Sequence, residues 1–275
     1  LQAIRYVLPA RLMLDRGDSP ESAPVGQIIR TEEFRSRELP RSLSRHSAAT
    51  VIGVQPAPAN QVAIVPVFGI IGKRLSDFEM MCGGCDVDDI EENLAEAIND
   101  PKVASVILHL DSPGGVVTGV PELAAKIRAW SQQKPIYAFT DTLCASAAYW
   151  LASACTGIFC TPTADIGSIG VYMALIDSSA NWAQEGYKLV LIKAGDRKAD
   201  GISGAPVAPE AIALWQAECD VIYAMFTGDV RTARPSVAAA TMQGQTFMGD
   251  AAKAALLVDD IVPDLQSLLA QVLAA

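Results

Sequence analysis

Continuous apolar stretches alternate with amphipathic stretches through the middle of the chain. The apolar runs predict β-strands over 61–72, 103–110, 135–140 and 157–161. Helical periodicity predicts helices over about 86–99, from the loop at 111–115 to about 130, and over 146–155. Asp86 or Asp88 is the candidate N-cap of the first helix. Alternating helices and apolar strands indicate an α/β fold, with helices packed on a buried parallel sheet.

The pattern changes towards both ends of the chain. Residues 1–60 end in a linker-like stretch at 55–60, and Pro, Ser and Arg dominate their second half. We therefore predict an N-terminal arm over 1–60, partly helical or disordered, and one domain over 61–275. After a turn at 167–173, the predicted elements are a helix over 178–186, a strand over 188–193, and helices over 208–233, 235–240, 249–256 and 263–274.

Composition narrows the class of protein. The 275 residues are 51% hydrophobic, which is enough to bury a large core. A net charge of −10 argues against a general nucleic-acid-binding protein. The N-terminal arm carries eight arginines against six acidic residues, a net charge of +2, so the rest of the chain carries −12. These arginines form either a solvated segment or a docking surface for an acidic partner or a neighbouring subunit.

The placement of the cysteines predicts a cytoplasmic protein, and the lack of cofactor-binding motifs predicts one without prosthetic groups. The six cysteines lie mostly in apolar segments, as expected for reduced, buried thiols. Cys82 and Cys85 form a single C-x-x-C pair, so we expect free thiols rather than a zinc site. No apolar run reaches membrane-spanning length and no signal peptide is visible, so we expect no membrane anchor. Without a P-loop or a ligand cluster, we expect no cofactor and no metal.

A serine among small residues is the first candidate for chemistry. Ser146 lies between the strand predicted at 135–140 and a short apolar helix, within Cys144-Ala-Ser-Ala-Ala-Tyr149. Small neighbours let a substrate carbonyl approach closely, and a helix N-terminus favours developing negative charge. This environment suits a nucleophile that forms an oxyanion adduct. The alternative is a serine that only caps a helix, because serine is a preferred N-cap.

Two further stretches supply candidate partners for this serine. In Asp111-Ser-Pro-Gly-Gly115 a strand ends, proline sets a turn, and two glycines allow positive φ and close approach to a ligand. Such a loop suits an oxyanion hole, and an ordinary strand-to-helix turn is the alternative. Downstream, Lys193 and Lys198 are both candidates for a general base, since burial can lower a lysine pKa. A charged surface loop is the alternative there.

Histidine is scarce in this sequence. His46 lies in the N-terminal arm, and His109 lies in an apolar strand, where we expect a packed and hydrogen-bonded side chain. A Ser–His–Asp triad therefore has poor material. A Ser–Lys pair, which follows the same logic of nucleophile and base, has good material.

Four motifs, in this order, resemble peptidase family S49, which includes signal peptide peptidase A and the phage head-maturation proteases. They are the Asp-Ser-Pro-Gly-Gly loop after a strand, the Ser146 helix, the turn Gly167-Ser-Ile-Gly-Val171 and the loop Gly195-x-x-Lys198. The match covers roughly residues 61–262, and the interval of 52 residues between serine and lysine is typical of short family members.

The resemblance implies a role for each matching residue. Ser146 is the expected nucleophile, Lys198 the expected general base, and Ser168 the residue that orients the lysine. The expected oxyanion donors are a glycine of the loop and the amide that follows the serine, that is Gly114, Gly115 and Ala147. The family also implies a ClpP/crotonase-like superhelix of ββα-type units. It further implies a homo-oligomer in which serine and lysine come from adjacent repeats or subunits.

The expected activity is that of a serine endopeptidase with a Ser–Lys dyad acting on polypeptides. A single copy of the motif set and the lack of a visible anchor favour the phage or prophage subgroup. We therefore expect a capsid-assembly protease that processes scaffold or capsid proteins in the host cytoplasm or the prohead. The alternatives are a peptidase that degrades signal peptides and an inactive structural ring subunit of the same fold. A crotonase-type acyl-CoA enzyme shares the fold but needs no Ser–Lys pair.

Overall fold

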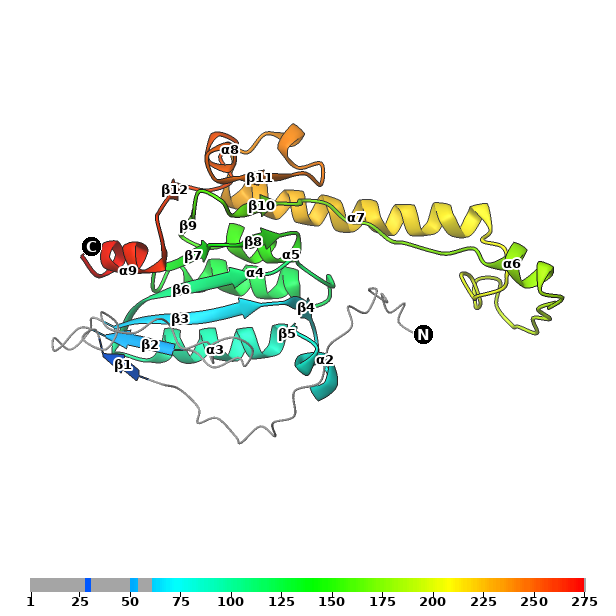
Figure 1. The fold of residues 1–275 in the computed structure, drawn as a ribbon, viewed down its shortest axis with the longest axis horizontal. Coiled ribbons are helices and arrows are strands. Elements are labelled where there is room, and N and C mark those ends of the chain that lie inside the picture. The colour runs from blue at the N-terminus through cyan, green and yellow to red at the C-terminus, as the bar shows by residue number, and fades with distance from the viewer. Residues whose placement is uncertain (1–27, 31–49, 54–60, 275) are drawn as a thin grey trace.

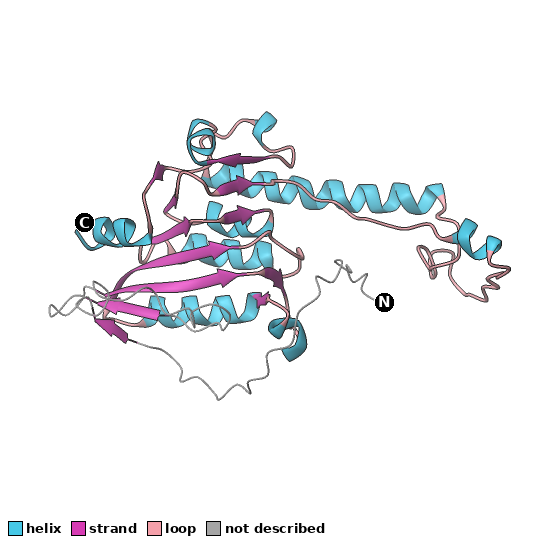
Figure 2. Cartoon of the chain, viewed as in Figure 1, coloured by secondary structure: helices cyan, strands magenta, loops and turns pink. Residues whose placement is uncertain are grey.

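A computed structural model describes residues 28–30, 50–53 and 61–274, so most of the predicted N-terminal arm lies outside the described residues. Its centre is a seven-stranded sheet with the order β1-β2-β3-β6-β7-β9-β12 (Figures 1 and 2). Neighbouring strands are parallel except for the antiparallel pair β2–β3. The strands are β1 (Ile28–Arg30), β2 (Thr50–Gly53), β3 (Gln61–Phe68), β6 (Val103–Asp111), β7 (Ile136–Thr140), β9 (Gly157–Cys160) and β12 (Asp260–Ile261).

Shorter strands pair with one another beside the main sheet. β8 is parallel to β10, β10 is antiparallel to β11, and β4 is parallel to β5. A main-sheet strand, a short strand and a helix recur as β3-β4-α3, with α2 and β5 inserted, and as β7-β8-α5, so the expected ββα-type units are present. The short strands are β4 (Ile70–Gly72), β5 (Gly84–Asp86), β8 (Leu143–Ala145), β10 (Asp165–Gly167) and β11 (Thr246–Met248).

Helices cover both faces of the main sheet. α3, α4 and α5 belong to one core cluster, with side chains such as Leu94 and Leu123 fully buried. α9 packs on the opposite face against Ile64 and Phe139. The helices are α2 (Asp77–Met81), α3 (Val87–Asn99), α4 (Val120–Trp130), α5 (Ala147–Ser153), α6 (Ser179–Gln184), α7 (Pro209–Ala233), α8 (Gly249–Ala254) and α9 (Leu265–Ala274), with a 3₁₀ turn at Ala239–Thr241.

The long helix α7 extends out of the body of the molecule. Its C-terminal part packs on α5, where the rings of Phe226 and Trp150 stack with centroids 4.4 Å apart. Its N-terminal part points away from the sheets, and α6 with its flanking loops lies at that far end (Figure 1). We call residues 171–208 the projecting segment. This segment packs on the first turns of α7, since a Cβ built at Gly201 would lie 3.2 Å from the Trp215 ring.

The structure confirms the predicted α/β class with a mostly parallel sheet, and it corrects several local predictions. The strand predicted at 188–193 is wrong. No strand of the described chain pairs with this segment, and side chains such as Val190 and Ile192 are exposed. The helix predicted at 235–240 is only the 3₁₀ turn. α2 was not predicted, although Ser76 and Glu79 form a capping box that is visible in the sequence.

Two observations bear on the chain's organisation. β1 and β2 fall inside the predicted N-terminal arm and extend the main sheet beyond β3, while the boundary at residue 60 stays a prediction. Within the described ranges, none of the helices has the length and apolar character needed to cross a membrane.

Candidate active site

Ser146 stands at the turn between β8 and α5. Its φ of 54° and ψ of −125° form a backbone conformation that residues with a side chain rarely adopt. Such a conformation persists only where the surroundings fix it. Here the Ser146 N–H donates to the Gly167 carbonyl at 2.8 Å, and the Ser146 carbonyl accepts from the Trp150 N–H at 3.0 Å. A strained strand-to-helix turn of this kind presents the serine hydroxyl at a helix N-terminus.

The helix behind Ser146 is held rigidly. All seven residues of α5 are buried. The Trp150 indole N–H donates to the Asp229 carboxylate of α7 at 2.8 Å, and the Tyr149 hydroxyl donates to the Leu257 carbonyl at 2.9 Å. Burial raises the pKa of the Tyr149 phenol, so this hydroxyl stays protonated and keeps donating. Ser146 therefore sits at the start of an element with little freedom to shift.

Gly114 packs directly against the serine. A Cβ built on Gly114 would lie 2.6 Å from the Ser146 Cβ and 2.8 Å from the Ala147 nitrogen, and the φ of Gly114 is 93°. Only glycine fits such a position. Gly115 approaches β4 even more closely, because its added Cβ would lie 1.9 Å from the Ile71 carbonyl oxygen. The two glycines thus have different contacts: Gly114 packs on Ser146, and Gly115 packs on β4.

The hydrogen bonds of this loop distinguish one occupied amide from two open ones. The Gly114 N–H donates to the Ser112 hydroxyl at 3.1 Å. The Ile71 N–H donates to the Gly114 carbonyl, and the Val116 N–H donates to the Ile71 carbonyl. Because these two bonds flank Gly115, its own N–H points away from β4. Among the described residues, no partner is recorded for the Gly115 N–H or for the Ala147 N–H that starts α5. Of the expected donors, Gly115 and Ala147 are therefore the two that suit an oxyanion hole.

Ser168 follows β10, the strand that lies beside β8. β8 and β10 are parallel, with Gly167 paired to Ala145, so Ser168 and Ser146 each come directly after a paired residue. Ser168 also has a positive φ, 51°, and its N–H donates to the Gln245 carbonyl at 2.8 Å. The structure thus brings Ser168 to the same edge as Ser146.

Lys198 is not part of this arrangement within one chain. It is exposed in the projecting segment, where its N–H donates to the Gly195 carbonyl at 3.2 Å. The projecting segment packs near Trp215, whereas α5 packs on Phe226, and this offset of eleven residues corresponds to about 16 Å of helix. Figure 1 shows the same separation, with α5 and α6 at opposite ends of α7. The competing Lys193 bonds to the Asp196 carbonyl in the same loop.

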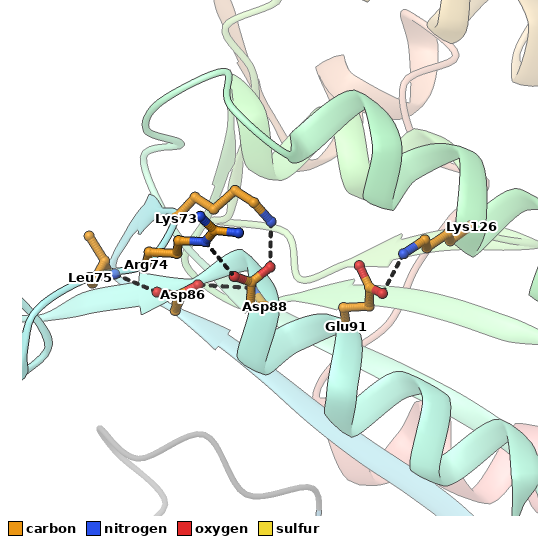
Figure 3. A network of polar contacts seen from close by, with 7 residues as sticks. All are labelled: Lys73, Arg74, Leu75, Asp86, Asp88, Glu91 and Lys126. Carbon is orange, nitrogen blue, oxygen red and sulfur yellow. Dashed lines mark hydrogen bonds and ion pairs between the residues drawn. The ribbon is translucent and has the colours of Figure 1, made fainter. Parts of the chain in front are cut away.

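A further lysine, Lys73, lies just after β4, the strand that contacts the glycine loop, but its amine is already engaged in an ion pair. Lys73 follows β4 and forms an ion pair with Asp88, which lowers the pKa of that carboxyl (Figure 3). In the same network the buried Asp86 carboxylate accepts from the Leu75 N–H at 2.6 Å and from the Asp88 N–H at 2.8 Å. A second ion pair, Lys126–Glu91, ties α4 to α3. These contacts fix the β4–β5 pair that supports Gly115, and they leave the Lys73 amine paired with Asp88.

His109 is packed and hydrogen-bonded, as the sequence predicted. Its Nε2 lies 3.2 Å from the Asp141 carboxylate, which lowers the pKa of Asp141. Its ring contacts those of Phe68 and Phe139, with centroids 5.0 and 5.2 Å away. Strand alternation places His109 on the Ile107 side of β6, which is the α9 face and not the α5 face. The histidine therefore belongs to the packing of the sheet.

The fold and this site define an α/β protein with a strained serine beside a glycine loop, and comparison with known proteins gives the family. The model of peptidase family S49 matches residues 128–271. The chain belongs to this family.

Two phage proteins are similar to the chain in sequence. It is 34% identical to the head-tail preconnector protein of Enterobacteria phage P21 over 194 residues, 68% of this chain and 39% of that protein. It is 32% identical to capsid assembly protease C of Escherichia phage lambda over 171 residues, 62% of this chain and 39% of that protein. The chain thus spans about two fifths of the length of these relatives. Among solved structures, a ClpP1 variant from Listeria monocytogenes matches 74% of this chain and 94% of its own, with 14% identity and a TM-score of 0.47.

Proposed function

We propose that this protein is a serine endopeptidase in which Ser146 is the nucleophile and Lys198 of a neighbouring copy is the general base. The observation that carries the proposal is the strained Ser146 turn with two open amides close by, packed so tightly on Gly114 that a Cβ built on this glycine would lie 2.6 Å from the Ser146 Cβ. A backbone conformation that costs about 1–3 kcal/mol is seldom kept at a serine that only caps a helix. Membership of peptidase family S49 supports the same reading.

The geometry supports a two-step hydrolysis. A neutral Lys198 amine takes the Ser146 proton as the hydroxyl oxygen attacks the peptide carbonyl carbon. The oxyanion accepts hydrogen bonds from the Gly115 and Ala147 N–H groups, each worth roughly 2.7–4 kcal/mol. The lysine ammonium then protonates the leaving amine. Water repeats the cycle on the acyl-enzyme and releases the second product. In this scheme Ser168 accepts a hydrogen bond from the lysine and orients it.

A second copy of the chain completes the site in this proposal. One chain keeps α6 and its flanking loops, which include Lys198, at the far end of α7 from α5, the helix that follows Ser146. The projecting segment and α7 also expose apolar side chains, which a neighbouring surface would cover. The most exposed of these are Ile176, Val190, Ile192 and Val221, each with more than 60% of its surface accessible.

The substrate we propose is a scaffold or capsid polypeptide, cut in the host cytoplasm or inside a prohead. The supporting observation is the similarity to two phage proteins, one of them named a capsid assembly protease. Degradation of signal peptides is the alternative within the same chemistry. An inactive ring subunit is the alternative outside it.

Two experiments test the proposal. First, a fluorophosphonate should label the assembled wild-type protein at Ser146 and should not label Ser146→Ala. Second, inactive Ser146→Ala and Lys198→Ala subunits, dissociated and reassembled in equal amounts, should regain about a quarter of wild-type activity, since one interface in four pairs an intact serine with an intact lysine. Lys193→Ala is the matched control and should keep its activity.

The outcomes separate the alternatives. An unlabelled but well-folded wild-type assembly would favour the inactive ring subunit. Activity that survives in Lys198→Ala would refute the lysine base. Labelling with no recovery in verified mixed assemblies would place the base within the same chain as Ser146.

A further inference from the structure

Ser112 links the three backbone segments that form the site. Its side chain is fully buried, and its hydroxyl donates to the Gly69 carbonyl at 2.6 Å and accepts from the Gly114 N–H at 3.1 Å. Its own N–H donates to the Leu143 carbonyl at 2.8 Å, and its carbonyl accepts from the Ala145 N–H at 3.1 Å. One residue therefore contacts the turn before β4, the glycine loop, and the strand that leads into the nucleophile.

These bonds determine where the Gly115 N–H points. The Gly114 carbonyl and the Gly115 N–H belong to one planar peptide unit and point in opposite directions. The Ile71 N–H holds that carbonyl at 2.8 Å, while the Ser112 hydroxyl holds the N–H on the other side of Gly114. Gly114 has a φ of 93° and no side chain to restrict it, so without these two bonds its flanking peptides could rotate.

We propose that Ser112 is the positioning residue of the oxyanion hole: its hydroxyl fixes Gly114 so that the Gly115 N–H faces the developing oxyanion. This inference rests on the proposed function. Ser112 does not touch the substrate in this view. It acts through the backbone, by using the Gly114 amide and leaving the Gly115 amide for catalysis.

The expected effect is on turnover more than on binding. Removing one oxyanion donor typically lowers kcat by about 10²–10³-fold, and a misplacement of about 1 Å costs about 10²-fold. Ser112→Ala should therefore lower kcat by about 100-fold with little change in KM. Because the lysine is not involved, the shape of the pH profile should not change.

The test compares two inhibitors on the assembled protein. A peptide aldehyde forms a hemiacetal whose oxygen occupies the oxyanion hole, whereas the alcohol of the same peptide only binds. Ser112→Ala should weaken aldehyde binding by the factor lost in kcat/KM and leave alcohol binding unchanged. Ser153→Ala is the matched control, since Ser153 is equally buried and its hydroxyl donates to the Trp150 carbonyl at 2.7 Å, away from the glycine loop. This control should change neither inhibitor constant.

Each outcome decides the inference. If Ser112→Ala loses activity while the ratio of aldehyde to alcohol affinity stays at the wild-type value, Ser112 is only structural and the inference is overturned. If Ser112→Ala does not fold, Ser112→Cys replaces it, because its thiol fills the space of the hydroxyl with a somewhat larger atom but accepts hydrogen bonds weakly. That variant should show a smaller shift of the same ratio, and an unchanged ratio overturns the inference. If the wild-type protein neither binds the aldehyde nor reacts with a fluorophosphonate, the proposed function fails as well.

Discussion

Replacing Ser146 by glycine should make the protein more stable than replacing it by alanine. Ser146 keeps a backbone conformation with φ 54° and ψ −125°, which costs about 1–3 kcal/mol for a residue with a Cβ. Glycine adopts positive φ without that cost, but it adds about 0.4–1 kcal/mol of entropy to the unfolded chain. The difference predicts that Ser146→Gly raises the free energy of unfolding by about 0.5–2 kcal/mol relative to Ser146→Ala, which keeps the Cβ and the strain.

Thermal unfolding of the two variants at one protein concentration measures this difference without interference from self-cleavage, since both lack the hydroxyl. A gain of about 1 kcal/mol corresponds to a rise in Tm of about 2–4 °C for a chain of this size. Ala148→Gly, inside the same buried helix, is the control and should be destabilising by about 1 kcal/mol, because a helix interior disfavours glycine. A Ser146→Gly variant no more stable than Ser146→Ala would show that the turn stores no strain.

Three other perturbations follow from the contacts of the site. Asp229→Ala should lower the free energy of unfolding by about 1–3 kcal/mol in urea, because the buried Trp150 indole N–H loses its acceptor; Asp229→Asn keeps an acceptor and should lose less, and equal losses would contradict this. Iodoacetamide at about pH 8 should modify the exposed Cys82 and leave activity intact. Cys85 should not react, because burial raises its pKa to about 12 and keeps it a thiol. Peptide mapping that ties inactivation to a buried cysteine would refute a serine nucleophile. The hydrogen bond from His109 lowers the pKa of the Asp141 carboxyl. This pair therefore stabilises the fold above the unfolded carboxyl pKa of about 4, and the contribution is lost as the pH falls through the folded pKa. The free energies of unfolding of wild type and Asp141→Asn should converge in acid, and a constant difference would contradict the shift.

The central strands β3, β6, β7 and β9 were predictable because they are largely buried on both faces. A strand such as β6 is a continuous apolar run, and Asp86 caps α3 as its position indicated. The short strands were harder to predict from the sequence. β8 has three residues, and its identity depends on pairing with β10 rather than on hydrophobic period. Residues 188–193 show the converse, since their apolar residues suit a strand but no neighbouring strand of the described chain pairs with them.

The candidate site was predictable where its residues are close in sequence. Small residues around Ser146 and the adjacent glycines indicated a place for an oxyanion. Which glycine amide is left open could not be predicted, because the Gly114 N–H donates to the Ser112 hydroxyl, and that hydroxyl in turn donates to the carbonyl of Gly69, 43 residues before Ser112. The separation of Lys198 from the serine depends on the direction of α7, and periodicity gives a helix's length but not its direction.

The way α7 is anchored has a mechanical consequence. Its 25 residues make a rod about 37 Å long that is held to α5 only near its C-terminal end. A tilt of about 3° at that anchor moves the far tip by about 2 Å, which is more than the roughly 1 Å that catalysis tolerates. A lever of this length cannot aim a chemical group by itself, so the surface that receives the tip must correct its position. If the tip carries the base, a pair of copies is active only when the two have docked in register. A misassembled pair is then inactive without any separate inhibitor.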